Sequence, residues 1–440
     1  VVLSSKLEDM QKAYVEKFGG ASVNTSSAVK NVLSILGSEK RKRIVVVSAM
    51  GKTTNALEKV VNLWHNERRV DEKDFEALLS YHFEIIDGLF KKENDRMACR
   101  SLVALMLEEC RAKILTLNPN DYDFLYDSIV SYGERVSTSI ISSYMSAEGF
   151  SHRHISAPDF IKTNNNFRTS DLKWKQTETL IKQNLLPLFD VCDTVLTQGF
   201  IGSTKEGYTT TLGREGSDFS AAIFAYCSDA ESMTIWKDVS GVMNADPKKM
   251  KHTVLLETVP YKEAIELSYY GASIIHPKTI KPLENKQIPL YVKSFNNPQD
   301  KGTVISDCKE LCPLVPNYIF KDNQTLLSVY PKDFSFIAEE NISKIFEVLS
   351  TFGIKVNMMQ NSALSFSVCF DRNDNLLPEI IETLQQSYVV RYNNSLCLLT
   401  IRHYEENSVS NALNTEQYRI LIEQKSRITL QCLVERKADS

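Results

Sequence analysis

The sequence predicts an α/β fold: an open, mostly parallel sheet with helices on both faces, followed by tandem small α+β units. Short β-branched runs such as residues 43–48 alternate with segments of helical spacing, which implies parallel strands joined by right-handed crossovers. Turn-forming residues gather at 296–302, and a proline-containing connector follows at 312–316. Beyond it, a strand–helix–strand pattern occurs twice, more weakly the second time.

Length and composition exclude several classes of protein. At about 150 residues per domain, 440 residues predict about three structural units, and 43% apolar residues are enough for buried cores. The formal net charge of −4 gives no broad cationic field for nucleic acid or anionic lipid. No apolar run approaches the ~20 residues that span a bilayer, and no secretory leader is evident. We therefore expect a cytoplasmic protein with neither nucleic acid nor a membrane as its partner.

The elements follow in order along the chain. The first part contains predicted strands at 14–18, 43–48, 194–200, 232–237 and 288–294, and predicted helices at 26–36, 55–65 and 217–226. Residues 66–150 are charged and leucine-rich with helical periods, and they predict a helical lobe. The first domain is therefore expected to span residues 1–305. One α+β unit is expected at 318–390, and a second, partly degenerate one at 391–440.

Two glycine-bearing turns are candidate anion sites. Residues 17–20 place a lysine and two glycines where a strand meets a helix, so that backbone N–H groups can approach an anion. Residues 209–218 bring together hydroxyls, the Arg214 guanidinium and a helix start, which suits bidentate recognition of carboxylate or phosphate. The alternatives are an ordinary strand-to-helix turn at the first and a helix cap by Ser217 or Asp218 at the second.

Other polar features have competing interpretations. Glu134 is a lone carboxylate expected near a helix start; it is interpreted as an acid that complements the helix dipole, with a functional carboxylate as the alternative. Residues 49–54 end like a P-loop, but Val46 stands where that motif needs glycine. The basic run 40–43 is interpreted as a solvated face. His276 is interpreted as a structural histidine, with a general base as the alternative.

No pattern indicates a resident metal ion. The nine cysteines are scattered without a CxxC pair, and His276 has no second histidine at metal-ligand spacing. We expect reduced thiols and no protein-bound metal site.

Six motifs together resemble those of aspartate kinases and occur in that family's order over about residues 14–300. They are the segments 17–23, 46–55, 133–135, 213–218, 236–247 and 266–277. The tail resembles the family's tandem ACT domains, which are ferredoxin-like α+β units. The resemblance implies an amino-acid-kinase fold. It also implies transfer of the γ-phosphoryl group of ATP, bound with Mg²⁺, to the side-chain carboxylate of L-aspartate, which begins lysine, threonine and methionine biosynthesis.

The same resemblance implies roles for individual residues. Lys17 should contact the transferred phosphoryl group, Arg214 should clamp a substrate carboxylate, and Asp218 should orient Lys17; these three are the expected catalytic residues. Glu134 should pair with the substrate ammonium. The other expected substrate-binding residues are Ser48, Thr54 and Ser217. The expected ATP-binding residues are Lys17, Gly19, Gly20, Ser22, Lys237, Asp238, Met243 and Lys248.

Three positions depart from the family pattern. Aspartate kinases often carry lysine where this chain has Ser273 and threonine where it has Lys237, and Glu215 replaces the second glycine of the usual Gly-Arg-Gly-Gly-Ser-Asp. Our hypothesis is that Lys237 supplies the positive charge that Ser273 lacks. Glu215 adds negative charge beside an anion site, which is acceptable if its carboxylate points to solvent.

The ACT-like tail predicts regulation. Asn357 and Ser362 are the expected effector contacts, for lysine or, less favoured, threonine, and we expect a homodimer or tetramer assembled through this tail. The alternative is a tail that only dimerises the chain. Two other functions stay open: a related kinase acting on glutamate, carbamate or a nucleotide, and a catalytically dead amino-acid sensor subunit, which Ser273 and Glu215 would suit.

Overall fold

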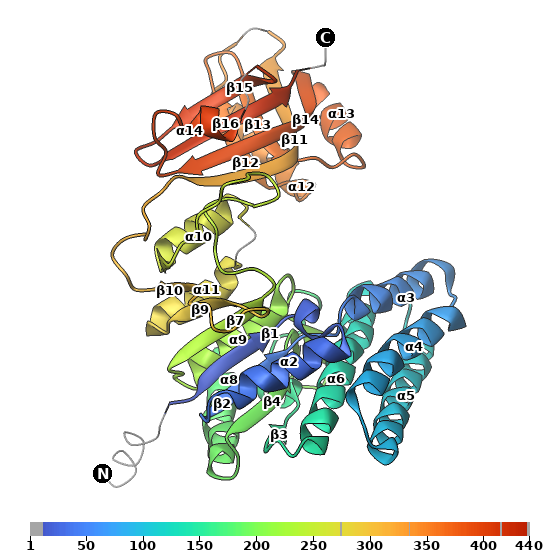
Figure 1. Cartoon of the computed structure of the whole chain (residues 1–440). Helices are drawn as coiled ribbons and strands as arrows, with labels where there is room; N and C mark the ends of the chain where they lie inside the picture. Colours follow the sequence, from blue (N-terminus) through green and yellow to red (C-terminus); the bar gives the residue numbers. More distant parts are fainter. Residues whose placement is uncertain (1–11, 273–274, 334, 414–415, 438–440) are drawn as a thin grey trace. The chain divides into compact units, whose positions relative to one another are not determined.

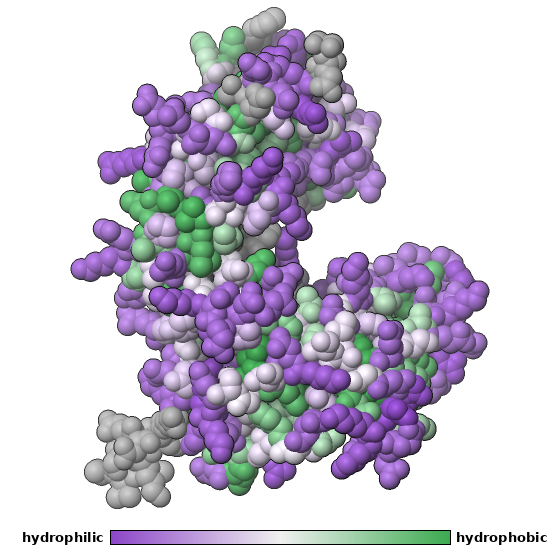
Figure 2. All heavy atoms as spheres, in the orientation of Figure 1, coloured by the Kyte–Doolittle hydropathy of each residue, from purple (hydrophilic) through white to green (hydrophobic). Residues whose placement is uncertain are grey.

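The computed structural model describes residues 12–272, 275–333, 335–413 and 416–437 of the chain. The chain divides into two compact units, which we describe separately. The first unit contains residues up to 242 together with 255–265 and 275–313, and the second contains 243–254, 266–274 and the chain from 314 onward. The face of the molecule drawn in Figure 2 is mostly hydrophilic, with apolar side chains in scattered groups.

An eight-stranded sheet is the centre of the first unit (Figure 1), in the order β3-β4-β2-β1-β7-β9-β10-β8. The strands from β3 to β9 in this order are all parallel, β10 runs antiparallel to β9, and β8 is parallel to β10. The bounds are β1 (Tyr14–Phe18), β2 (Arg43–Val47), β3 (Arg153–His154), β4 (Thr194–Gln198), β7 (Ser232–Lys237), β8 (Thr258–Pro260), β9 (Leu290–Ser294) and β10 (Thr303–Ser306). A separate antiparallel hairpin pairs β5 (Ile201–Ser203) with β6 (Thr209–Thr211). The carboxyl ends of the parallel strands meet at one edge of the sheet, the edge at which open α/β sheets bind ligands.

Helices cover the sheet because successive strand residues face opposite sides. Val45 and Val47 of β2 pack into the large core under the N-terminal helices, while α9 packs against β1, β2 and β7. The lobe predicted at 66–150 consists of three long helices, and Asp71 and Asp121 cap the first and last of them. The helices of this unit are η1 (Gly20–Val23), α2 (Ser26–Gly37), α3 (Thr53–Glu67), α4 (Glu72–Leu89), α5 (Glu93–Thr116), α6 (Tyr122–Ala147), α7 (Ala157–Phe160), α8 (Trp174–Leu180), η2 (Ile181–Leu185), η3 (Leu186–Asp190), α9 (Gly216–Cys227) and α11 (Pro277–Lys286).

The second unit is built on one antiparallel six-stranded sheet, in the order β12-β13-β11-β14-β16-β15. Two long central strands, β11 (Asn317–Pro331) and β14 (Tyr388–Arg402), pair along most of their length, so the boundary predicted at 390 falls inside β14. The remaining elements are α12 (Glu339–Thr351), β12 (Val356–Asn361), β13 (Phe366–Asp371), α13 (Leu377–Gln385), α14 (Ser408–Ala412), β15 (Tyr418–Lys425) and β16 (Thr429–Arg436). Within 391–413 and 416–437, the second repeat has the five-residue α14 as its helix, which agrees with its weaker sequence pattern. The helix α10 (Tyr261–Tyr269) begins in the first unit and ends in the second.

The predicted fold class is confirmed, but the sequence pattern missed α10, α11, the β5–β6 hairpin, the strands β3, β8 and β10, and the short helices between residues 157 and 190. In α11 the apolar period is short and Pro282 lies inside the helix, so no helical spacing was recognised there. The hairpin strands are three residues long, which is too short for alternation to be recognised.

The basic run at 40–43 is not simply a solvated face, because two of its arginines bind a buried carboxylate in β1. Glu16 is 1% exposed; its Oε1 accepts a hydrogen bond from Arg41 Nη2 at 2.8 Å and lies 3.5 Å from Arg43 Nη1. Its Oε2 accepts from the indole N–H of Trp236 at 2.9 Å. Arg41 and Arg43 are two residues apart and therefore reach the same side, where they neutralise Glu16.

We expect Glu16→Ala to lower the free energy of unfolding by about 3–5 kcal/mol, because it leaves a buried guanidinium without its carboxylate. Chemical denaturation of the full chain measures the change. The matched control is Glu108→Ala, which removes an exposed ion pair with Arg111 and should cost less than about 1 kcal/mol. Equal effects of the two substitutions would contradict a stabilising role for the Glu16 network.

Candidate active site

A buried ion pair lies at the carboxyl edge of the parallel sheet. Lys17, near the end of β1, has its Nζ 2.6 Å from Oδ1 of Asp218, and their side chains are 11% and 6% exposed. Asp218 lies in the first turn of α9, so the positive end of that helix dipole faces the same region as the Lys17 ammonium. This edge therefore concentrates positive charge with one carboxylate to orient it, an arrangement suited to an anionic ligand.

The turn after β1 packs directly onto the turn after β2. A Cβ at Gly20 would lie 2.9 Å from the carbonyl oxygen of Ala49, so only glycine fits there. The Gly51 N–H donates to the Gly20 carbonyl at 3.1 Å, and the Ser48 N–H donates to the Phe18 carbonyl at 3.1 Å. This packing brings the predicted Gly19, Gly20 and Ser48 together.

Glu134 is a buried carboxylate with an unsatisfied oxygen. It is 2% exposed, and within the described structure its Oε2 accepts no hydrogen bond. Burial raises the pKa of Glu134 to about 8, against the opposing effect of the Ala49 N–H and the Thr54 hydroxyl. A buried carboxylate oxygen without a donor is suited to binding a cation such as a substrate ammonium.

The expected position of Glu134 at a helix start is wrong, because it lies in the middle of α6. The dipole-complementing alternative therefore does not apply to it. The Ser137 hydroxyl, one turn further on, donates to the Ser48 carbonyl at 2.7 Å. This bond fixes α6 against the turn after β2 and keeps Glu134 beside the half-buried Ser48 and Thr54.

Arg214 lies in the turn that precedes α9. Its side chain is exposed and makes no ion pair within the described residues, so the guanidinium is available to a ligand. Ser217 follows in the first turn of α9, and its hydroxyl does not cap that helix; the helix begins after Glu215 without a side-chain cap. The cap alternative for Ser217 and Asp218 is thus not what the structure has.

Glu215 does not point to solvent as the sequence analysis required. Its Oε2 accepts a hydrogen bond from the backbone N–H of His276 at 2.9 Å, which ties the turn before α9 to the start of α11. His276 in turn caps α11 by accepting from the Lys278 N–H at 3.1 Å, which matches the structural interpretation of this histidine.

The predicted nucleotide-binding residues are divided between the two units. Ser22 is buried in η1, and Lys237 ends β7 one residue after Trp236, which is in register with Phe18 of β1. Lys237 therefore lies at the same edge as Gly19, with the exposed Asp238 following it. Met243 and Lys248 lie in the segment 243–254 of the second unit, and Ser273 lies outside the described residues, so the compensation of Ser273 by Lys237 stays a hypothesis.

The predicted effector residues lie on β12, an edge strand of the second unit's sheet, and just after it. The Asn357 amide donates to Gln324 Oε1 at 2.8 Å and to Asp371 Oδ1 at 2.9 Å, and its Oδ1 accepts from Lys321 Nζ at 2.9 Å. Ser362 is exposed and its hydroxyl lies 2.8 Å from that of Ser365.

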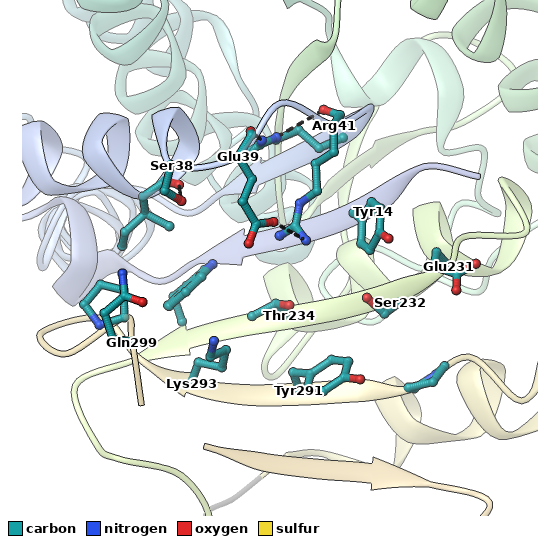
Figure 3. A pocket seen from close by; sticks show the side chains of 15 residues that line it. Tyr14, Ser38, Glu39, Arg41, Glu231, Ser232, Thr234, Tyr291, Lys293 and Gln299 are labelled. Carbon is teal, nitrogen blue, oxygen red and sulfur yellow. Dashed lines mark hydrogen bonds and ion pairs between the residues drawn. The ribbon is translucent and has the colours of Figure 1, made fainter. Parts of the chain in front are cut away.

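A cavity of about 380 Å³ elsewhere in the first unit contains none of the predicted site residues. Figure 3 shows that it lies along β1, β7 and β9, with Tyr14, Thr234 and Tyr291 on its floor and the ion pair between Glu39 and Arg41 above them. We therefore place the candidate site at the strand ends and not in this cavity.

The sequence analysis missed one buried acid near the site, Asp127 on α6. It is fully buried and hydrogen-bonded to the last residue of β6, Thr211. Its spacing of seven residues before Glu134 is a signal for a shared helix face.

Among the described residues, no three His, Cys, Asp or Glu side chains are grouped to hold a metal ion. In the described part of the chain, no helix is both long enough and apolar enough to cross a membrane.

The chain is similar to known proteins of one family. Residues 12–294 match the amino acid kinase family. The chain is 30% identical over 366 residues to the lysine-sensitive aspartokinase 3 of Escherichia coli (strain K12), covering 82% of this chain and 79% of that protein. It is 27% identical over 385 residues to the chloroplastic bifunctional aspartokinase/homoserine dehydrogenase of Daucus carota, of which it spans 42%.

Solved structures are similar over nearly the whole chain. The crystal structure of E. coli aspartokinase III with lysine and aspartate has a TM-score of 0.79 at 26% identity and covers 97% of this chain and 96% of its own. The same enzyme with aspartate and ADP has a TM-score of 0.76 at 26% identity, covering 96% of both chains. The family match covers residues 12–294, and the chain is similar to E. coli aspartokinase in both sequence and structure. The chain therefore belongs to the amino acid kinase family and, within it, to the aspartokinases.

Proposed function

We propose that this protein is an aspartate kinase, which transfers the γ-phosphoryl group of ATP to the side-chain carboxylate of L-aspartate and forms 4-phospho-L-aspartate. The observation that carries the proposal is the ion pair of Lys17 and Asp218 at the sheet edge, with Glu134 buried behind the neighbouring turn. The name of the E. coli relative, and its complexes with aspartate and with ADP, support the choice of substrates.

The chemistry asks mainly for charge neutralisation. The attacking carboxylate is already ionised at pH 7, so no residue has to remove a proton. Lys17 stabilises the charge of the transferred phosphoryl group, Asp218 orients the Lys17 ammonium, and the N–H groups at Gly19 and Gly20 line the phosphates.

The amino-acid substrate is held at two charged ends. Glu134 binds its ammonium, Arg214 binds a carboxylate, and Ser48, Thr54 and Ser217 donate hydrogen bonds. These contacts align the attacking oxygen with the phosphorus, so that the reaction proceeds within the complex.

ATP is the proposed nucleotide, and Lys237, Asp238, Met243 and Lys248 are its proposed further contacts. Mg²⁺ is proposed to accompany ATP as a ligand of its phosphates, as it does in other kinase sites. When bound, Mg²⁺ supplies neutralisation of phosphate charge. A cytoplasmic location remains a prediction.

We also propose feedback inhibition through the second unit, by lysine in preference to threonine. The E. coli relative is named lysine-sensitive, and its structure contains lysine. Asn357 lies on the edge strand β12 and Ser362 just after it, and an edge strand is suited to pairing with a second copy of the chain. We therefore propose a homo-oligomer assembled through this unit.

We expect the wild-type protein to release ADP with aspartate and at least about 100-fold more slowly with glutamate, because a longer side chain misplaces the attacking oxygen. A coupled assay measures the rate. Lys17→Met should lower kcat by about 100- to 1,000-fold, whereas Lys293→Met, which removes an ammonium from over the Trp236 ring, should not. Faster turnover with glutamate would support the rival kinase, and no turnover with any substrate would support the sensor.

We expect the KM for aspartate to fall between pH 7 and pH 8.5, by up to about tenfold per pH unit below the pKa of Glu134. The raised pKa, about 8, leaves this carboxyl mostly protonated at pH 7, and only its ionised form pairs with an ammonium. Glu134→Gln should raise the KM about 10- to 100-fold and remove its dependence on pH. The KM for ATP is the internal control, and a pH slope that persists in Glu134→Gln would contradict the assignment.

We expect lysine to inhibit the wild-type enzyme more strongly than threonine, and Asn357→Ala to weaken that inhibition by about 5- to 100-fold, which corresponds to a coupling of about 1–3 kcal/mol. Initial rates at fixed aspartate give the inhibition constant, and light scattering of the same sample gives the assembly. Asn411→Ala, on the surface of α14, is the control. Uninhibited turnover with either amino acid would favour a tail that only dimerises.

A further inference from the structure

Asp127 is a buried carboxylate on the same face of α6 as Glu134. Its side chain is 0% exposed, and it precedes Glu134 by seven residues, which is about two helical turns. Burying a charge is costly unless hydrogen bonds compensate, so its partners show what the chain gains from it.

Three hydrogen bonds converge on Asp127 from two other segments. Its Oδ2 accepts from the backbone N–H of Thr211 at 2.8 Å and from that of Arg168 at 2.9 Å, and its Oδ1 accepts from the Thr211 hydroxyl at 2.6 Å. Burial raises the pKa of Asp127 to about 6, and these three donors oppose the rise because they favour the ionised carboxylate. The carboxylate therefore ties α6 to both segments.

Both segments adjoin the turn that contains Arg214. Thr211 ends β6 three residues before it, and the next residue, Leu212, donates its N–H to the Phe200 carbonyl at 2.9 Å. Gly213 has a φ of +76°, and a Cβ there would lie 3.2 Å from the Arg168 carbonyl oxygen. The turn that carries Arg214 is thus held against the segment whose backbone Asp127 binds.

We propose that Asp127 is a positioning residue for the amino-acid substrate: it sets the distance between Glu134, on its own helix, and Arg214, at the end of the strand it holds. The inference rests on the proposed function, which assigns Glu134 to the substrate ammonium and Arg214 to its carboxylate. Asp127 acts through Thr211 and does not touch the substrate.

The chain offers a matched pair of variants on β6. The Thr211 hydroxyl binds Asp127, whereas the Thr210 hydroxyl points to the other side of the strand and lies 2.7 Å from the Thr163 hydroxyl. Both threonines are fully buried, so Thr211→Val and Thr210→Val each remove one buried hydroxyl from the same strand with little change in shape. The first removes a bond to Asp127, and the second does not.

The experiment measures KM for aspartate, KM for ATP, kcat and the melting temperature of the full-length protein. We expect Thr211→Val to raise the KM for aspartate about tenfold with the KM for ATP unchanged, because one charge-assisted hydrogen bond is lost. Thr211→Ser, which keeps the hydroxyl, should restore the wild-type KM. Thr210→Val should lower the melting temperature by about as much as Thr211→Val does. It should leave the KM for aspartate unchanged.

Several results would overturn the proposal. An equal rise in the KM for aspartate in Thr211→Val and Thr210→Val, a parallel rise in the KM for ATP, or a lower melting temperature with no change in KM would each show a purely structural role. If Thr211→Val does not fold, Asp127→Asn replaces it and is judged by the same split between the two KM values. Wild-type turnover with aspartate tests the proposed function separately; without that turnover, aspartate affinities from calorimetry are compared among the same variants.

Discussion

The ion pair between Lys17 and Asp218 is the interaction on which the arrangement of the site depends. A kinase that phosphorylates a carboxylate must bring two anions together, and this chain, with a net charge of −4, has no general positive field to attract them. It therefore needs positive charge placed locally. The parallel sheet provides the place, since its carboxyl edge collects Lys17 from β1 and the N-terminus of α9. Asp218 keeps the ammonium in that position.

Glu16, Asp127 and Glu134 are buried carboxylates of the first unit, and their different partners indicate different roles. Glu16 is neutralised by two guanidinium groups and accepts a hydrogen bond from an indole N–H, so both of its carboxylate oxygens are already bound. Asp127 is satisfied by donors from the end of β6 and from the segment at Arg168, which fits its proposed positioning role. Glu134 keeps an oxygen without a donor, which is the feature on which its proposed role as the partner of a substrate ammonium rests. Burial alone would not have distinguished these acids.

Sequence patterns predicted the central parallel strands β1, β2, β4, β7 and β9 because such strands are short apolar, often β-branched runs, as in 43–47. They also selected the glycine turn at 19–20, where close backbone approach at Gly20 excludes a side chain. They failed where long-range contacts decide the outcome. The position of Glu134 within α6 could not be read locally, because that helix continues through buried polar residues. Arg41 and Arg43 looked like a solvated run because their partner, Glu16, lies on a different strand.

The departure at Glu215 illustrates how this chain rebuilds a position that the family usually fills with glycine. Glu215 has a φ of +54°, in the left-handed region, which costs an ordinary residue about 1–2 kcal/mol. Its carboxylate accepts the backbone N–H of His276, a charge-assisted bond whose contribution of about 1.5–3 kcal/mol offsets that strain. The carboxylate is thereby directed toward the start of α11, where it accepts a hydrogen bond. It therefore repels an anion bound beside Arg214 less than a carboxylate without a donor would. Compared with glycine, Glu215 restricts the backbone of the turn before α9 and links that turn to the segment that follows residue 274. This explains how an acidic residue is accommodated next to the proposed anion site.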